Sequence, residues 1–229
     1  MGRKANRICI SPAWRTYRSG RHSWITSGVG APINGDKIYN GAVDNASGVA
    51  ALLTMAKAFV ALSARPARSI IFLATTGEEQ GEVGADYFVH HPPVSIDRLA
   101  AAINVDGLSF TTFEELEARG GSNSSLGTVA DVAAHQLGLR LKNQPLGVSG
   151  SDHAPFLLTG IPALWIGAAL TDEWMRTRYH TPKDDMDQPL DFEAAVSYTK
   201  LVFTTGYLAA QTSWRPEWNT DEFFGWKRE

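Results

Sequence analysis

Four carboxylates and one histidine have the residue types and the sequence positions of a metal site. They are Asp44, Glu78, Glu79, Asp106 and His180. Carboxylates that meet at one place repel one another unless a cation lies between them. Carboxylate oxygen with neutral imidazole nitrogen suits zinc, with manganese or cobalt as possible substitutes. Where two adjacent glutamates end a strand, one can bind the metal while its neighbour acts as a base toward the reaction water.

Short apolar segments and helical patterns predict the elements that would position these side chains. We expect strands at residues 69–74, 101–105 and 163–166, and helices at residues 46–62, 125–137 and 192–209. The first strand segment is almost wholly apolar, which is typical of a strand covered on both faces. Strands that alternate with helices indicate the α/β class with a mainly parallel sheet. The carboxyl ends of such strands share a crevice, and the acidic residues follow those ends.

Composition limits the class of protein. The chain has 229 residues, of which 44% are hydrophobic and 20% charged, as expected of a globular protein with one large core. Its formal charge of -3 lacks the basic excess that binding to a phosphate backbone needs, so we expect no nucleic-acid partner. Polar residues interrupt the most apolar stretch, residues 49–64, so no membrane span is expected. The single cysteine, Cys9, excludes an intrachain disulfide and a cysteine-built zinc site.

Five sequence blocks occur in the order and with the spacing of a known family. They are GDKIYNGAVDNASGVA, ATTGEEQGEVGADYF, INVDG, SDHAPFLLTGIPALWIG and YHTPKDDMD. Together they resemble the M28 family of zinc aminopeptidases, from about residue 28 to the C-terminal helix. The resemblance implies a three-layer α/β/α sandwich with a mixed, mainly parallel sheet. It also implies a two-zinc site that removes N-terminal residues from peptide substrates by means of a water that bridges the metals.

The resemblance implies a role for each matched residue. Asp44 would bridge the two zinc ions, and Glu78 would be the general base. Glu79 and His180 would complete one zinc, and Asp106 would serve the other. The residues expected to support these ligands are Asp152, Tyr179 and Asp184.

The HxD motif of the family, whose histidine would be the remaining ligand, is missing from this sequence. The nearest histidine, His22, lies in residues 1–27, which contain six basic residues and no acidic residue. We therefore expect residues 1–27 to be an atypical segment that is disordered, truncated or out of frame, with no signal peptide in it. Residues 28–229 would form the zinc peptidase catalytic domain. Two zinc ions are expected from the family, and one or none if the missing ligand is not replaced.

The candidate carboxylates also have simpler interpretations. Asp44 or Asn45 could cap the helix that follows. Glu78 and Glu79 could be a solvated pair at the end of a strand. Asp106, which precedes a glycine, could be a turn residue.

The histidines and the function have alternatives as well. His180 could only pack its loop, and His153 or His22 could replace the missing ligand. At the level of function, the chain could be a catalytically impaired remnant that serves as a binding domain. It could also resemble the glutaminyl cyclases, which use a single zinc, and a peptide with an N-terminal glutamine separates that activity from a peptidase. The sequence predicts neither the compartment nor the oligomeric state.

Overall fold

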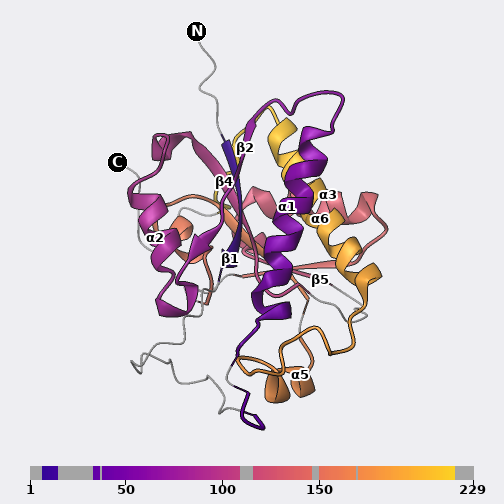
Figure 1. Ribbon diagram of the computed structural model, residues 1–229. Coiled ribbons are helices and arrows are strands. Elements are labelled where there is room, and N and C mark those ends of the chain that lie inside the picture. Colours follow the sequence, from indigo (N-terminus) through magenta and orange to yellow (C-terminus); the bar gives the residue numbers. More distant parts are fainter. Residues whose placement is uncertain are drawn as a thin grey trace.

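A mixed β-sheet forms the centre of the protein (Figure 1). The computed structural model describes residues 7–14, 33–36, 38–108, 116–145, 150–168 and 170–219. Its strands are β1 (Arg7–Trp14), β2 (Ser69–Phe72), β3 (Thr75–Thr76), β4 (Leu99–Val105), β5 (Leu116–Arg119), β6 (Leu141–Gln144) and β7 (Ala163–Gly167). They lie in the order β2-β1-β4-β7-β5-β6, and β3 pairs with the end of β1. Only the β5–β7 pair among these strands is antiparallel, so the sheet is mixed and mainly parallel, as predicted.

Helices cover both faces of this sheet. They are α1 (Ser47–Val60), α2 (Val83–His90), α3 (Ser125–Gln136), α4 (Ala154–Leu158), α5 (Asp172–Thr177) and α6 (Phe192–Gln211). Helices α1, α3 and α6 lie on one face, and α2 lies on the other (Figure 1). The predicted three-layer α/β/α sandwich is therefore confirmed. Within the described ranges, no helix combines the length and the apolar character that crossing a membrane requires.

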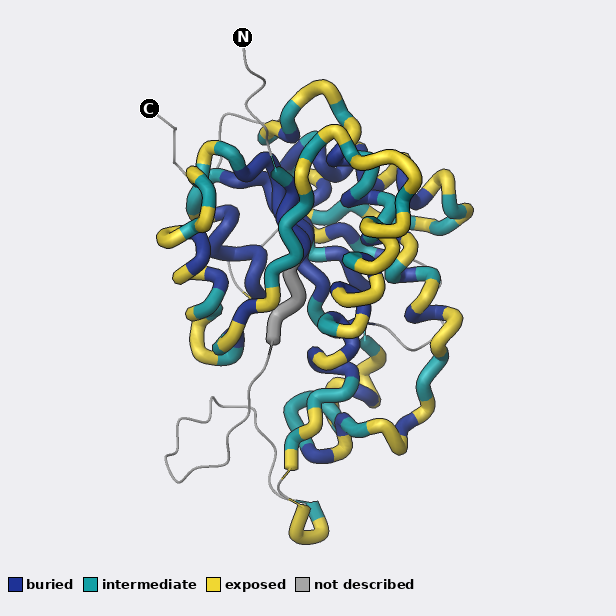
Figure 2. The backbone as a smooth tube through the Cα atoms, turned by 45° about the horizontal axis from the view of Figure 1, so that its top comes forward, coloured by how far each residue is buried: buried dark blue, intermediate teal, exposed yellow. Residues whose placement is uncertain are grey.

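Strand β1 contributes to two apolar cores. Ile8 and Ile10 belong to a cluster with buried residues of α1, α3 and α6, whereas Cys9 belongs to a second cluster with α2 and α4. Successive side chains of a strand point to opposite faces of the sheet, which explains the alternation. Figure 2 shows the buried residues concentrated along the central strands. The sheet is therefore held from both sides, and its strand ends provide a fixed base for the loops.

Most of the elements predicted from the sequence are confirmed. Helices α1, α3 and α6 and strands β2, β4 and β7 each begin and end within two residues of the predicted bounds. Residues 69–74 are covered on both faces, as predicted, because Ile70 and Phe72 pack against one apolar cluster and Ile71 and Leu73 against the other. In β2, Ser69 is exposed and the next three residues are only partly buried, because β2 is an edge strand of the sheet.

The segment comprising residues 1–27 contains a strand that the sequence analysis missed. Arg7–Trp14 form β1, which pairs in parallel with β2 on one side and with β4 on the other. The expected disorder of residues 1–27 is therefore wrong for these eight residues. The apolar triplet Ile8–Ile10, fully buried here, is the signal in the sequence, and it is too short to show a period. The boundary after residue 27 stays a prediction, because residues 15–32 lie outside the described ranges.

Candidate metal centre

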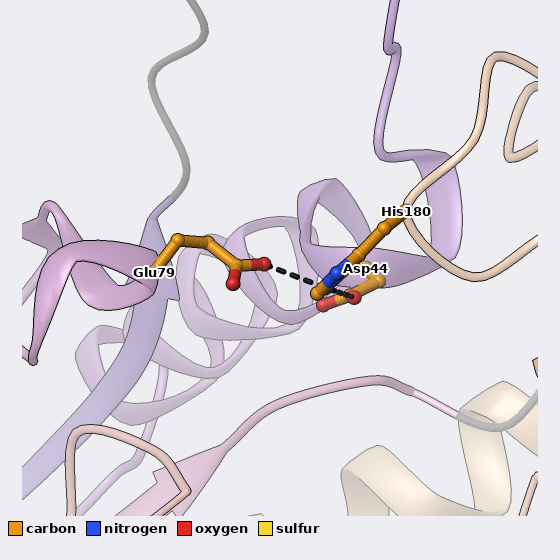
Figure 3. Close-up of side chains that lie close together, drawn as sticks. All are labelled: Asp44, Glu79 and His180. Atoms are coloured by element: carbon orange, nitrogen blue, oxygen red, sulfur yellow. Dashed lines mark ion pairs between the residues drawn. The ribbon is translucent and has the colours of Figure 1, made fainter. Parts of the chain in front are cut away.

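Three of the candidate ligands come together from separate parts of the chain. Asp44 lies just before α1, Glu79 follows β3 in a short 3-10 helix (Glu78–Gln80), and His180 follows α5. Their potential ligand atoms all lie within 4.8 Å of one another. In Figure 3 the side chains of Glu79 and His180 point toward each other, with Asp44 beside His180. Within the described ranges, no other group of three or more His, Cys, Asp or Glu side chains has this geometry.

The distances in this group, hereafter the ligand triad of Asp44, Glu79 and His180, fit a zinc ion. The Nε2 atom of His180 lies 3.5 Å from Oδ2 of Asp44 and 2.6 Å from Oε1 of Glu79. Bonds of about 2.1 Å in a tetrahedral zinc site place neighbouring ligand atoms about 3.4 Å apart. The first separation matches. The second is shorter, and it involves Glu79, whose side chain is 29% exposed and the least enclosed of the three. Two carboxylates and a neutral imidazole also balance the charge of a divalent ion.

Asp44 is positioned by the carboxylate of Asp184. Oδ1 of Asp184 accepts a hydrogen bond from the backbone N–H of Val43 at 2.8 Å, and Oδ2 accepts one from that of Asp44 at 2.9 Å. The backbone oxygen of Asp184 also accepts from the N–H of Ala42. Burial raises the pKa of the Asp184 carboxyl, and these backbone donors act in the opposite direction. Asp184 therefore holds the backbone of residues 42–44, and its support of a metal ligand stays a prediction.

Asn45 joins the start of α1 to the end of β4. Its Oδ1 accepts from the backbone N–H of Gly48 at 3.0 Å and of Gly107 at 3.3 Å. Its Nδ2 donates to the carbonyl of Val105 at 3.0 Å. The peptide bond between Asp44 and Asn45 is cis. Asn45, rather than Asp44, satisfies an N–H of the first helical turn, so the carboxylate of Asp44 lies beside Glu79 and His180 without serving as the helix cap.

Glu78 is buried beside Glu79, with only 8% of its surface exposed. Gly77 and Gly81 bracket the two glutamates with positive φ angles of 70° and 88°, a conformation that glycine adopts without strain. The interpretation of Glu78 and Glu79 as a solvated pair therefore does not hold for Glu78. A buried carboxylate next to a candidate metal ligand is in the place expected of a general base, and this role stays a prediction.

His180 is held by its neighbours on the same loop. Its ring stacks on that of Tyr179, with centroids 3.7 Å apart and planes at 24°. The backbone N–H groups of Arg178 and Tyr179 both donate to the carbonyl of Trp174, so the loop is anchored to α5. Tyr179 therefore contacts His180 directly, and its supporting role in the site stays a prediction. The side chain of His180 faces two carboxylates, so it does more than pack its loop.

Asp106 does not belong to the ligand triad. It follows β4, and its Oδ2 accepts a hydrogen bond from Oγ of Ser151 at 2.5 Å. Oγ of Ser151 also accepts from Nδ2 of Asn104, and the backbone carbonyl of Asp106 accepts from the indole N–H of Trp165. These contacts fix Asp106 at the expected end of the sheet. Its service to a second zinc ion stays a prediction.

Asp152 contacts the strand that precedes the two glutamates. It is fully buried, and its Oδ2 accepts a hydrogen bond from Oγ1 of Thr75, the first residue of β3. Because Glu78 and Glu79 follow β3 directly, this contact connects the segment before α4 to the strand that carries them. Asp152 is thus tied to the strand before the two glutamates, and its supporting role stays a prediction.

Of the two histidines considered as replacement ligands, the structure describes only His153. His153 is 5% exposed and does not belong to the triad. Neither of its ring nitrogens has a hydrogen-bond partner among the described residues. Burial, and then the positive charge of Arg119, lowers the pKa of His153 to about 4, so it is neutral at pH 7. His22 lies outside the described residues.

Comparison with known families places the chain among metallopeptidases. The family model described as "Peptidase family M28" matches residues 24–205, which is most of the sequence. The chain belongs to peptidase family M28. This M28 member is also 28% identical, over 242 residues, to a probable zinc metalloprotease of Pyrenophora tritici-repentis, an alignment that covers 88% of this chain and 55% of the fungal protein.

Solved structures show the same fold. The M28 chain matches the LapA aminopeptidase of Legionella pneumophila with a TM-score of 0.70 and 20% identity, covering 91% of this chain and 52% of that one. It matches the zinc aminopeptidase BSAP of Bacillus subtilis with a TM-score of 0.68 and 22% identity, and the match covers 90% of this chain and 46% of the BSAP chain. The chain thus spans about half the length of these relatives. At such identities the similarity establishes the fold, which is that of zinc exopeptidases.

Several residues that position the site were not picked out from the sequence. Thr75 and Ser151 lie within the blocks that resemble the M28 family, and Asn45 was considered only as a helix cap. Each is a small polar residue that is buried here, and buried polar side chains usually mark a hydrogen-bonding role. Gln188 had no such signal, because a glutamine among acidic residues and prolines looks like a solvent-exposed loop residue.

Proposed function

We propose that this M28 peptidase binds zinc through Asp44, Glu79 and His180 and hydrolyses the N-terminal peptide bond of peptides. The observation that carries the proposal is the ligand triad, whose three donors lie within 4.8 Å of one another. Three protein ligands with one position open is the usual arrangement of a catalytic zinc. The zinc metalloprotease and aminopeptidase relatives add support for the reaction class.

When bound, zinc would act as a Lewis acid toward the scissile carbonyl and make a water molecule more acidic. The protein supplies the proton transfers. Glu78 takes the proton of the attacking water and returns it to the amine of the leaving peptide. Because Glu78 is buried and follows β3 in the same turn as Glu79, the base and the ligand keep a fixed relation to each other.

A second zinc ion would use Asp106. Its carboxylate already accepts a hydrogen bond from Ser151, and it lies at the end of β4, next to the backbone that Asn45 holds. The proposal commits to one ion at the ligand triad. Binding of a second ion by Asp106, with His22 or another histidine, remains what the family resemblance implies.

The activity test uses two matched substrates. The purified chain, supplied with zinc, is incubated with a leucine chromogenic anilide and with the same compound acetylated on its amino group. We expect turnover of the free-amine substrate only, and loss of turnover in Glu78→Gln. Equal turnover of both compounds would contradict an aminopeptidase, and absence of turnover by a zinc-loaded chain would favour the impaired remnant or the second candidate below.

Cyclisation of N-terminal glutamine is the second candidate function. One observation favours it: the ligand triad is a complete protein ligand set for a single zinc, without Asp106 or a further histidine. In this reaction the α-amine attacks the side-chain amide carbon, a ring forms and ammonia leaves. Release of ammonia from a peptide with an N-terminal glutamine, without shortening of the peptide, would establish it in place of the peptidase.

A further inference from the structure

We propose that Gln188 is a positioning residue for the metal ligand Asp44 and that it acts through Asp184. This inference rests on the metal site proposed above. Gln188 follows the loop of His180, is only 6% exposed, and lies far in sequence from Asp44. Its side chain touches none of the three residues of the triad in any hydrogen bond that the structure contains.

The amide of Gln188 has a fixed orientation. Its Oε1 accepts a hydrogen bond from the indole N–H of Trp174 at 2.8 Å. An indole N–H can only donate, so the oxygen of the amide must face Trp174 and the nitrogen must face the other way. Nε2 then donates to Oδ1 of Asp184 at 2.9 Å and to the carbonyl of Asp185 at 2.7 Å. The buried Nε2 of Gln188 therefore points at the Asp184 carboxylate, because Trp174 of α5 holds the other end of the amide.

Asp184 connects Gln188 to the backbone of Val43 and Asp44. Both of its carboxylate oxygens accept backbone N–H groups, from Val43 and from Asp44, and Oδ1 also accepts from Gln188. Such charge-assisted hydrogen bonds are stronger and more directional than neutral ones. Rotation of the Asp184 carboxylate would break the contact with the backbone of Asp44 directly.

The resulting series of hydrogen bonds connects both ends of the metal site. It runs from Trp174 through Gln188 and Asp184 to the backbone of Asp44, while the loop that leaves α5 carries His180. Two ligands that are far apart in the sequence are therefore set by one polar network. Removal of partners outside the ligand shell typically weakens metal binding by about 10- to 100-fold.

The test compares Gln188→Met with Gln144→Met. Gln144 is a suitable control because its Nε2 also donates to a carboxylate, that of Glu117, at 2.5 Å, but on strands β5 and β6. The zinc dissociation constant is measured by competition with a chromophoric chelator, and the melting temperature of the metal-free protein is measured in parallel. We expect the dissociation constant to rise about 10- to 100-fold in Gln188→Met and to stay within about 2-fold in Gln144→Met.

Two further variants separate positioning from packing. Gln188→Glu keeps an acceptor for Trp174 but replaces the donor to Asp184 with a second negative charge, so its zinc affinity should fall further than that of Gln188→Met. Trp174→Phe removes the indole donor and should shift the visible spectrum of the cobalt-substituted protein in the same direction as Gln188→Met. Unchanged affinity and cobalt spectrum in Gln188→Met, even with a lower melting temperature, would overturn the inference alone. Failure of the unaltered protein to bind zinc would overturn the proposed metal site as well.

Discussion

Glu78 performs the proton transfers of the proposed reaction, so its replacement should separate catalysis from metal binding. We expect Glu78→Gln to lower kcat by about 100- to 10,000-fold, the usual contribution of a general base. Zinc affinity should stay close to that of the unaltered protein, because Glu78 does not belong to the ligand triad. Steady-state kinetics and a zinc titration check both expectations.

The control for Glu78→Gln is Glu82→Gln, a half-exposed carboxylate one turn further along the chain. Its carboxylate accepts a hydrogen bond from the backbone of Gly150, and a glutamine oxygen can accept the same bond. If Glu78→Gln and Glu82→Gln had similar kcat values, Glu78 would not be the general base.

His153 should make the stability of the fold depend on pH. Burial and the charge of Arg119 lower its pKa to about 4, whereas an unfolded histidine titrates near pH 6.5. The stabilisation is therefore complete above about pH 6.5 and is lost as the pH falls toward 4, because the unfolded chain binds the proton more readily. The difference corresponds to about 3 kcal/mol.

Urea unfolding at about pH 7.5 and about pH 4, in the presence of a chelator, measures this effect. The variant His153→Leu should lose less stability between the two pH values than the unaltered protein does. His135→Gln, at an exposed position of α3, is the control and should retain the full pH dependence. An equal loss of stability in His153→Leu and the unaltered protein would show that another group is responsible.

Among individual residues, the candidate metal ligands could be predicted from the sequence, whereas most of the residues that position them could not. Asp44, Glu79 and His180 were chosen from the matched blocks, and the structure brings them together. Asp106 was chosen in the same way and lies on the expected side of the sheet, hydrogen-bonded to Ser151 instead of joining the triad. Gln188 could not be found, because its role depends on an indole and a carboxylate that only the folded loop places beside it.

The first turn of α1 packs so closely against Asn45 and the end of β4 that Gly48 has no room for a methyl group. A Cβ atom at Gly48 would lie 2.7 Å from the carbonyl oxygen of Val105 and 2.3 Å from Oδ1 of Asn45. We therefore expect Gly48→Ala to lower the free energy of unfolding by about 1 to 3 kcal/mol, the usual cost of overpacking. Urea unfolding of the metal-free protein provides the measurement.

Gly206→Ala in α6 is the matched control for Gly48→Ala. Its Cβ would lie 3.0 Å from Cδ1 of Ile10, the mobile tip of a side chain, so the neighbour can yield. Alanine in a helix interior is favoured over glycine by up to about 1 kcal/mol, and this gain should offset the contact. If Gly48→Ala were as stable as Gly206→Ala, the close approach of α1 to the end of β4 would not be a constraint.

At the element scale, long periodic segments were predictable and short ones were not. Helices α1, α3 and α6 show their apolar periodicity. Strand β7 is apolar over its whole length and β4 is apolar except for Asn104, because both faces of these strands are covered. By contrast, β1 has a buried triplet and no period, and β5 and β6 are four-residue strands that contain charged residues. Whether such a short segment forms a strand depends on its pairing with neighbouring strands, and a local sequence pattern does not show that pairing.

Across the whole molecule, a metal held by three loops should stabilise the fold. The triad joins the start of α1, the turn after β3 and the loop after α5, so a bound ion would cross-link distant parts of the chain. A free zinc concentration about 100 times the dissociation constant corresponds to about 2.7 kcal/mol of added stability. The melting temperature should rise with zinc and fall again with a chelator.

The matched control for this stabilisation is Glu79→Gln, which removes one ligand of the triad and should abolish the effect of zinc. Magnesium, which prefers six oxygen ligands, should shift the melting temperature of either protein far less. Equal stabilisation of Glu79→Gln and the unaltered protein would place the zinc elsewhere in the molecule.

The proposed zinc site can be tested directly by locating zinc in a crystal of the protein by anomalous diffraction at the zinc edge. We expect a peak within bonding distance of Oδ2 of Asp44, Oε1 of Glu79 and Nε2 of His180, with Glu78 facing the open position. A second peak beside Asp106 would show a site with two ions. Absence of a peak at the triad in a zinc-soaked crystal, or a peak bound by other residues alone, would contradict the proposed site.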